Sequence, residues 1–172
     1  MRKVRPMFQP VNVRPSNWNS RTHNKGDCTT RSMTYCLGGQ LTYEQIEAEQ
    51  YMYGKQMGTL RNATRVWSEV MKRRGYGWIQ FDKRVVREVI ATFFANYQHS
   101  FITLSRGHAC AVDRGIVIDT WDSRGGRVYG ILVKVEDIQF FKTSLLELGV
   151  EGKETDVPIP VQIRRRRRRF YW

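Results

Sequence analysis

Apolar residues recur at helical spacing through the first half of the chain, and this pattern predicts four helices. The predicted helices cover residues 28–37, 42–53, 60–74 and 83–97. Thr42 and Gln45 have the spacing of a capping box at the start of the second helix. Glycines at 38, 39 and 75 are predicted to end the first and third helices. The fourth helix is expected to point these apolar residues inward: Val85, Val86, Val89, Ile90, Phe93 and Phe94.

After residue 98 the pattern changes to short apolar runs rich in β-forming residues. Four strands are predicted, over residues 100–105, 107–112, 116–121 and 128–135. Asp113-Arg114-Gly115 supplies a turn between the second and third of these strands. Residues 136–148 fit either a short helix or a strand. Helices followed by strands predict an α+β fold in which N-terminal helices pack on a C-terminal antiparallel sheet.

The length of 172 residues suits one domain, which we place at residues 26–150. Residues 1–25 contain three prolines and no clear period, so we expect an extended basic arm. Residues 151–172 turn polar and then arginine-rich, and we expect a tail. No run approaches the roughly 18 apolar residues of a membrane span, and the N-terminus lacks the apolar region of a secretory signal. We therefore expect a protein that stays in a reducing compartment.

The net charge of +13 lies almost entirely at the two ends of the chain. Residues 1–26 hold six Lys or Arg and no acid, and residues 164–169 are six consecutive arginines. Between them, 17 basic residues face 16 acidic ones, so the middle of the chain is close to neutral. This distribution predicts that the ends contact a polyanion or an acidic partner. The alternative is a pair of solvated tails that only aid solubility.

The arginine run is followed by three aromatic residues at the very end of the chain. Guanidinium groups bind phosphates and aromatic rings stack on bases, so the tail suits nucleic acid or another protein. No base-reading motif is visible, so any contact with nucleic acid should be non-specific. The predicted contact residues are Arg164, Arg165, Arg166, Arg167, Arg168, Arg169 and Trp172.

The three cysteines occupy different predicted environments. Their odd number and the lack of a CxxC pair argue against a disulfide framework or a structural zinc site, and no cofactor is expected. Cys28 opens the first helix, with Asp27 as a possible cap, and a helix N-terminus lowers the pKa of a thiol. Cys36 lies in the helix body and Cys110 in a strand, where both suit a structural role.

His108 and Asp119 are expected to be cross-strand neighbours on either side of the Asp113-Arg114-Gly115 turn. A carboxylate beside an imidazole fixes its tautomer and stabilises its charged form. Asp122 competes with Asp119 for this role, but strand alternation places residue 122 on the opposite face. Trp121 is close enough in sequence to shield the contact from water. The role of Arg31, either beside a carboxylate or facing solvent, is left open.

Taken in order, Gly26-Asp27-Cys28, Gly107-His108 and Asp119-Thr120-Trp121 resemble the papain-like cysteine-peptidase superfamily. The small size and the order of elements are closer to its bacteriocin-processing and NlpC-like branches, and the motifs are similar to small proteins of tailed bacteriophages. The resemblance implies a papain-like fold. It also implies that Cys28 attacks, His108 transfers the proton and Asp119 orients the imidazole.

That superfamily usually carries a Gln several residues before the cysteine, and Thr22 stands six residues before Cys28. Asn24 is our candidate to complete the oxyanion hole with the backbone N–H of Cys28, and Asn19 and His23 are the alternatives. The expected function is a cysteine peptidase or amidase acting on a peptide, an isopeptide or peptidoglycan, in a virion or the host cytoplasm. Its rivals are a non-catalytic structural or accessory virion protein anchored by basic arms, and a non-specific nucleic-acid-binding protein.

Overall fold

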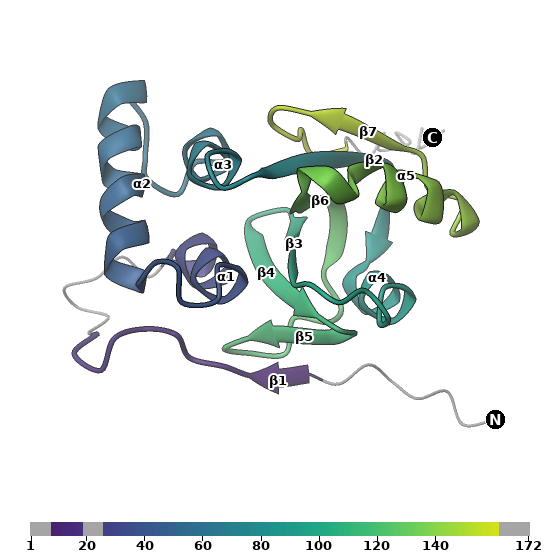
Figure 1. The fold of residues 1–172 in the computed structure, drawn as a ribbon, viewed down its shortest axis with the longest axis horizontal. Helices are drawn as coiled ribbons and strands as arrows, with labels where there is room; N and C mark the ends of the chain where they lie inside the picture. Colours follow the sequence, from purple (N-terminus) through teal and green to yellow (C-terminus); the bar gives the residue numbers. More distant parts are fainter. Residues whose placement is uncertain (1–7, 19–25, 162–172) are drawn as a thin grey trace, which may run out of the picture.

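The computed structural model describes residues 8–18 and 26–161, and within these ranges one mixed sheet is flanked by helices (Figure 1). The strands are β1 (Phe8–Pro10), β2 (Tyr76–Val86), β3 (Phe101–Ser105), β4 (His108–Asp113), β5 (Ile116–Asp119), β6 (Arg127–Lys134) and β7 (Gly152–Thr155). The helices are α1 (Cys28–Cys36), α2 (Tyr43–Met57), α3 (Thr64–Lys72), α4 (Arg87–Phe93) and α5 (Ile138–Glu147), with a 3-10 turn at Val135–Asp137.

The strand order in the sheet is β1-β5-β4-β3-β6-β2-β7. All neighbouring strands are antiparallel except β1 and β5, which are parallel. The predicted α+β class is confirmed, but the sheet is mixed rather than purely antiparallel. The parallel pair is formed by β1, which belongs to the N-terminal arm and is predicted to lie outside the sheet.

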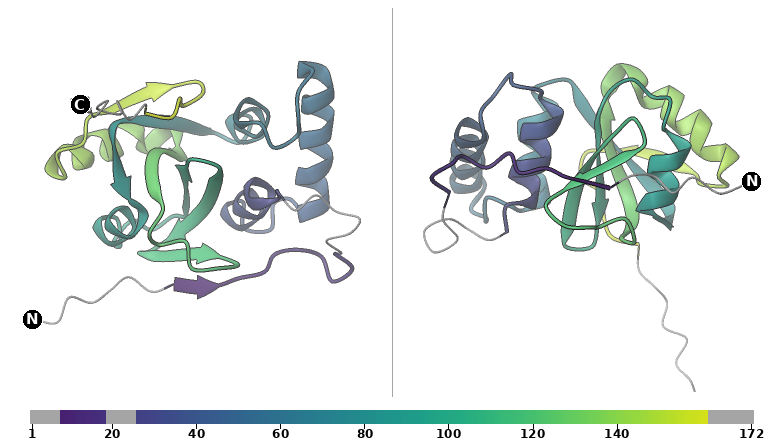
Figure 2. Two further views of the ribbon diagram at one scale, coloured as in Figure 1. Left: turned by 180° about the vertical axis from the view of Figure 1, so that it is seen from behind. Right: turned by 90° about the horizontal axis from the view of Figure 1, so that it is seen from below.

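Helices cover both faces of the sheet, so the domain has two apolar cores (Figure 2). On one face, α1, α2 and α3 bury residues such as Met33, Ile46 and Trp67 against β2, β3, β4 and β6. On the other face, α4 and α5 bury Phe94 and Phe141 among aromatic and β-branched residues of the same sheet. The prediction of N-terminal helices packed on the sheet is confirmed for the first face only.

α1 ends at the predicted glycines, and α2 begins at the predicted capping box. Gly38 and Gly39 have φ values of 56° and 89°, which side chains disfavour, and they follow the last turn of α1. The capping box of α2 is present: the Gln45 N–H donates to the Thr42 hydroxyl at 3.2 Å, and the Thr42 N–H donates to the Gln45 side chain at 2.9 Å. α2 then continues four residues beyond its predicted end and stops at Gly58.

The prediction of a helix over residues 83–97 is wrong for residues 83–86. Those residues instead complete the long strand β2, and α4 occupies only Arg87–Phe93. Val85 and Val86 pair with Val128 and Arg127 of β6, where β-branched side chains fit the pleated surface. Val89, which was expected to point inward, is 43% exposed.

Two further segments belong to the sheet although they were predicted as appendages. β1 pairs with β5, and β7 pairs with β2, so the predicted boundary at residue 150 is too early. Beyond β7, the Ile159 N–H donates to the Gln80 side chain at 2.9 Å, and Arg84 donates to the Val161 carbonyl at 2.7 Å. The chain is therefore held on the domain up to Val161. The ambiguous residues 136–148 are mostly helical, as α5.

Candidate active site

Cys28 is the first residue of α1, and the start of this helix lies against the start of β4. The Ser32 hydroxyl, one turn further along, donates to the Ala109 carbonyl at 3.1 Å and joins the two elements. The first N–H groups of a helix have no partner within it and carry partial positive charge. Cys28 lies at the helix start, as the sequence predicted, and it is partly buried there.

Asp27 stands at the N-cap position of α1 but does not cap it. Its buried carboxylate instead binds the guanidinium groups of Arg14 and Arg31 and the hydroxyl of Tyr43. Charged donors bind a carboxylate more strongly than a backbone amide does, and these partners occupy both of its oxygens. The predicted capping role is therefore wrong.

His108 is the first residue of β4 and follows a tight turn in which Gly107 has a φ of 75°. Its ring forms a hydrogen bond with the Cys28 thiol, and the backbone N–H of Ala109 forms another. The Nε2 atom of His108 lies 2.6 Å from Oδ2 of Asp119. Nδ1 is therefore the ring nitrogen left to face the thiol. Cys28, His108 and Asp119 form one hydrogen-bonded group.

The contact between His108 and Asp119 is diagonal across the β4–β5 hairpin. Arg114 and Gly115 form the turn with φ values of 46° and 82°, and Ala111 pairs with Ile118. This register places Asp119 opposite Cys110, not directly opposite His108. Diagonal neighbours on one face are still within reach of long side chains. The predicted contact is present, but the predicted register is wrong.

Asp119 is buried and its carboxylate has four partners. Oδ1 accepts from Arg31 at 2.9 Å and from the Thr120 N–H at 2.7 Å. Oδ2 accepts from the Ser123 hydroxyl at 2.7 Å and faces His108. The competing carboxylate, Asp122, lies at the surface and pairs with Arg124.

The electrostatics of the group favour a thiolate beside an imidazolium. Burial raises the pKa of Cys28, but hydrogen bonds from His108 and Ala109, with the charges of His108 and Arg31, outweigh it and lower the pKa. Burial lowers the pKa of His108, but its hydrogen bonds to Asp119 and Cys28 raise it above the ordinary value. Burial also opposes ionisation of Asp119, yet His108, Ser123 and Arg31 hold its pKa far below the usual range.

Cys28 differs from the two other cysteines. Burial raises the pKa of Cys36 to about 12, and burial likewise raises the pKa of Cys110. Both thiols therefore stay protonated and unreactive at neutral pH, as their predicted structural roles require. Among the three, Cys28 alone has a lowered pKa.

Trp121 lies against the imidazole, with a distance of 4.9 Å between the ring centroids of Trp121 and His108. It follows the end of β5 and is 54% exposed, so it forms part of the surface around the site. The sequence placed it near the His108–Asp119 contact, and the structure agrees. Its exposed ring offers apolar area to any molecule that approaches the thiol.

Several predicted site residues lie outside the described ranges. Asn24, the candidate for the oxyanion hole, is one, and the arginine-rich tail is another: Arg164, Arg165, Arg166, Arg167, Arg168, Arg169 and Trp172. Within residues 8–18 and 26–161, no group of three His, Cys, Asp or Glu side chains is arranged to hold a metal ion. No helix in those ranges is long and apolar enough to cross a membrane.

The sequence did not reveal the residues that hold Cys28, His108 and Asp119 in place. Arg31 was left open, and Arg14 and Ser123 were not considered. The spacing of four between Asp27 and Arg31 is typical of an ion pair on a helix and could have indicated one. Nothing in the sequence indicates the contacts of Arg14 and Ser123, because each depends on how the chain folds back.

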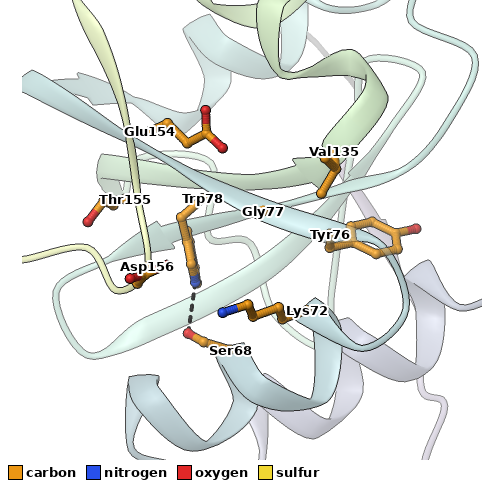
Figure 3. A pocket seen from close by; sticks show the side chains of 9 residues that line it. All are labelled: Ser68, Lys72, Tyr76, Gly77, Trp78, Val135, Glu154, Thr155 and Asp156. Carbon is orange, nitrogen blue, oxygen red and sulfur yellow. Dashed lines mark hydrogen bonds between the residues drawn. The ribbon is translucent and has the colours of Figure 1, made fainter.

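A pocket of about 300 Å³ lies elsewhere, between the end of α3 and strands β2 and β7 (Figure 3). Lys72, Glu154 and Asp156 border it, and the Trp78 indole donates to the Ser68 hydroxyl at 2.8 Å in its wall. It shares no residue with the group around Cys28.

Comparisons with family models, with curated proteins and with solved structures find no match to this chain.

Proposed function

We propose that this protein is a cysteine hydrolase that cleaves a peptide or isopeptide bond. The observation that carries the proposal is the hydrogen-bonded group of Cys28, His108 and Asp119, brought together from three separate elements. A thiol beside an imidazole that is held by a third group is the arrangement of an activated nucleophile. The thiol also stands at a helix N-terminus.

In the first half of the reaction, the Cys28 thiolate attacks the carbonyl carbon of the substrate and a C–S bond forms. The negative charge moves to the carbonyl oxygen, and in this proposal the backbone N–H of Cys28 stabilises it. The His108 imidazolium then gives its proton to the nitrogen of the leaving amine as the C–N bond breaks. The product of this half is a thioester on Cys28 and a free amine.

In the second half, neutral His108 removes a proton from a water molecule, which attacks the thioester carbonyl. The C–S bond breaks, a carboxylic acid leaves, and the thiolate–imidazolium pair is restored. Asp119 stays ionised throughout, because its partners hold its pKa far below the usual range. It keeps the imidazole in the orientation and tautomer that proton transfer requires.

The papain-like fold is part of the same proposal. It is supported by a nucleophile that opens a helix packed on a sheet, with the histidine and the aspartate on neighbouring strands of that sheet. Asn24 remains our candidate for the second oxyanion donor. A peptidoglycan stem peptide or a phage or host protein would be a substrate of suitable chemistry, and a virion-associated location remains a proposal from the resemblance.

The test is a cleavage screen against a proteome-derived peptide library and a peptidoglycan digest, with products identified by mass spectrometry. We expect new termini with the wild-type protein and none with Cys28→Ala. Cys36→Ala is the matched control, since it removes a partly buried thiol whose pKa is raised to about 12, and it should retain the activity. A product profile that is the same for wild type and Cys28→Ala would contradict the proposal and favour the non-catalytic virion protein.

A further inference from the structure

Residues 8–18, the described part of the N-terminal arm, make two contacts near the carboxylate of Asp119. One is with the backbone of Asp119, and the other is with the carboxylate of Asp27. β1 lies along β5, and the Val11 N–H donates to the Asp119 carbonyl at 2.9 Å. The chain then passes alongside α1 (Figure 1), where Val11 and Val13 line a small cavity with Arg31 and Tyr35. There Arg14 binds both oxygens of Asp27 at 2.6 Å each.

We propose that Arg31 is a positioning residue for Asp119, and that the N-terminal arm, through Arg14, is a working part of the active site. This inference rests on the proposed function, because positioning has a meaning only if the Cys28–His108 pair is active. It goes beyond that function because it gives a regulatory role to the arm, which contains none of the proposed catalytic residues. The arm becomes a segment whose attachment sets the reactivity of the thiol.

The physical basis is a continuous row of alternating charges. Arg14 binds Asp27, Arg31 binds Asp27 at 3.0 Å and Asp119 at 2.9 Å, and Asp119 binds His108. The side chain of Arg31 is only 10% exposed, and those of Asp27 and Asp119 are almost fully buried. Each of these buried carboxylates lies between oppositely charged neighbours in the row, and removal of one neighbour leaves the charge with fewer partners.

Arg31 is the member that connects the arm to the triad. Its Nε binds Asp27 while its Nη1 binds Asp119, so one rigid guanidinium joins two carboxylates. Without it, the Thr120 N–H is the one partner left to Oδ1 of Asp119 among the described residues, and the carboxylate can turn away from His108. A lysine carries the same charge on a single nitrogen and cannot reproduce the planar fork.

Arg14 is itself held in place from outside. Its guanidinium lies over the Trp18 ring, 3.7 Å from the centroid, while it binds Asp27. The Tyr43 hydroxyl on α2 donates to the same carboxylate at 2.9 Å, so Asp27 is fixed from the arm, from α1 and from α2. Loss of Arg14 leaves Arg31 as the sole cation in these contacts with Asp27, which draws Arg31 away from Asp119.

The test measures the pH dependence of iodoacetamide labelling at Cys28 in the full chain, together with the melting temperature. We expect Arg31→Gln to move the labelling midpoint upward by about one pH unit, which is about tenfold less thiolate at pH 6. Arg31→Lys should fall between wild type and Arg31→Gln, and Arg14→Gln should shift the midpoint in the same direction by less. The control is Arg73→Gln, which breaks an exposed ion pair of the same spacing with Glu69 and should leave the midpoint unchanged.

A role in stability alone predicts a different result, namely a lower melting temperature with an unchanged labelling midpoint in all variants. That result would overturn the inference. If Arg31→Gln does not fold, Arg31→Lys and Arg14→Gln decide the question by the same midpoint. A wild-type protein whose Cys28 labels as an ordinary thiol would instead overturn the proposed function, so the two failures are distinguishable.

Discussion

At the residue scale, the carboxylate of Asp119 determines how the imidazole is held. Each of its oxygens has two partners, so rotation of the group would break four interactions in a buried setting. A buried charge that loses its partners is strongly destabilised. The carboxylate is thereby fixed in position and in its ionised form, and its charge acts on His108 at 2.6 Å.

The first prediction at this scale concerns Asp119→Asn. The change keeps the shape of the side chain but removes the negative charge that favours imidazolium, so the pKa of His108 should fall. The measurement is an NMR titration of the His108 ring. Asp122→Asn is the matched control, because that carboxylate is exposed and faces Arg124. Equal His108 pKa values in the two variants would contradict the assigned role of Asp119.

The triad residues were predictable because their order along the chain and their local settings carry information. A cysteine at a helix start, and a histidine and an aspartate on either side of a tight turn, can be recognised without coordinates. Asp27 was misassigned as a cap because its competing partner Arg14 comes from a segment that shows no period. The contact of Arg31 with Asp119 depends on how α1 packs on the sheet, and that of Ser123 depends on the path of the loop after β5. Local sequence determines neither.

At the element scale, the short helix α4 offers a test of the packing. Within α4, Ile90 is fully buried, whereas the adjacent Val89 is 43% exposed. Ile90→Ala should lower the free energy of unfolding by about 2–5 kcal/mol, through lost burial and a new cavity. Val89→Ala should change it by no more than about 0.5 kcal/mol. Urea unfolding of the two variants measures both, and equal losses would show that α4 is oriented differently.

The error over residues 83–97 has a physical reason. Apolar side chains at Val85, Val86, Val89 and Ile90 fit a helical period, yet the first two belong to a strand. β2 gains ladder hydrogen bonds and packing from β6 and β7, both of which lie far away in the sequence. Strand propensity depends strongly on such tertiary partners, so the local pattern favoured the wrong element.

At the scale of the whole molecule, the two chain ends complete the sheet. β1 and β7 have three and four residues and form its opposite edges. Strands this short gain stability only from the neighbours they pair with, so their sequences look like irregular tails. The division into a domain and two appendages therefore underestimated the domain. The predicted binding of nucleic acid or other partners by the arginine-rich tail remains a prediction.

The candidate site lies near the edge of the sheet that β1 forms. β5 carries Asp119 between β4, which carries His108, and β1 of the arm. α1 brings Cys28 to the same place. The fold thus connects the basic arm to the candidate site, and a change in the arm is expected to alter the reactivity of the Cys28 thiol.

The most direct measurement is the rate of iodoacetamide labelling at Cys28 as a function of pH, in wild type and in His108→Ala. A Cys36→Ala/Cys110→Ala background removes the other thiols. We predict fast labelling near pH 6 in wild type, because the pKa of Cys28 is lowered mainly by its hydrogen bond with His108 against the effect of burial. In His108→Ala, labelling should follow an ordinary thiol with a pKa of about 8.5 or higher. Identical profiles for the two proteins, both typical of an ordinary thiol, would contradict an activated cysteine and leave the structural role as the better interpretation.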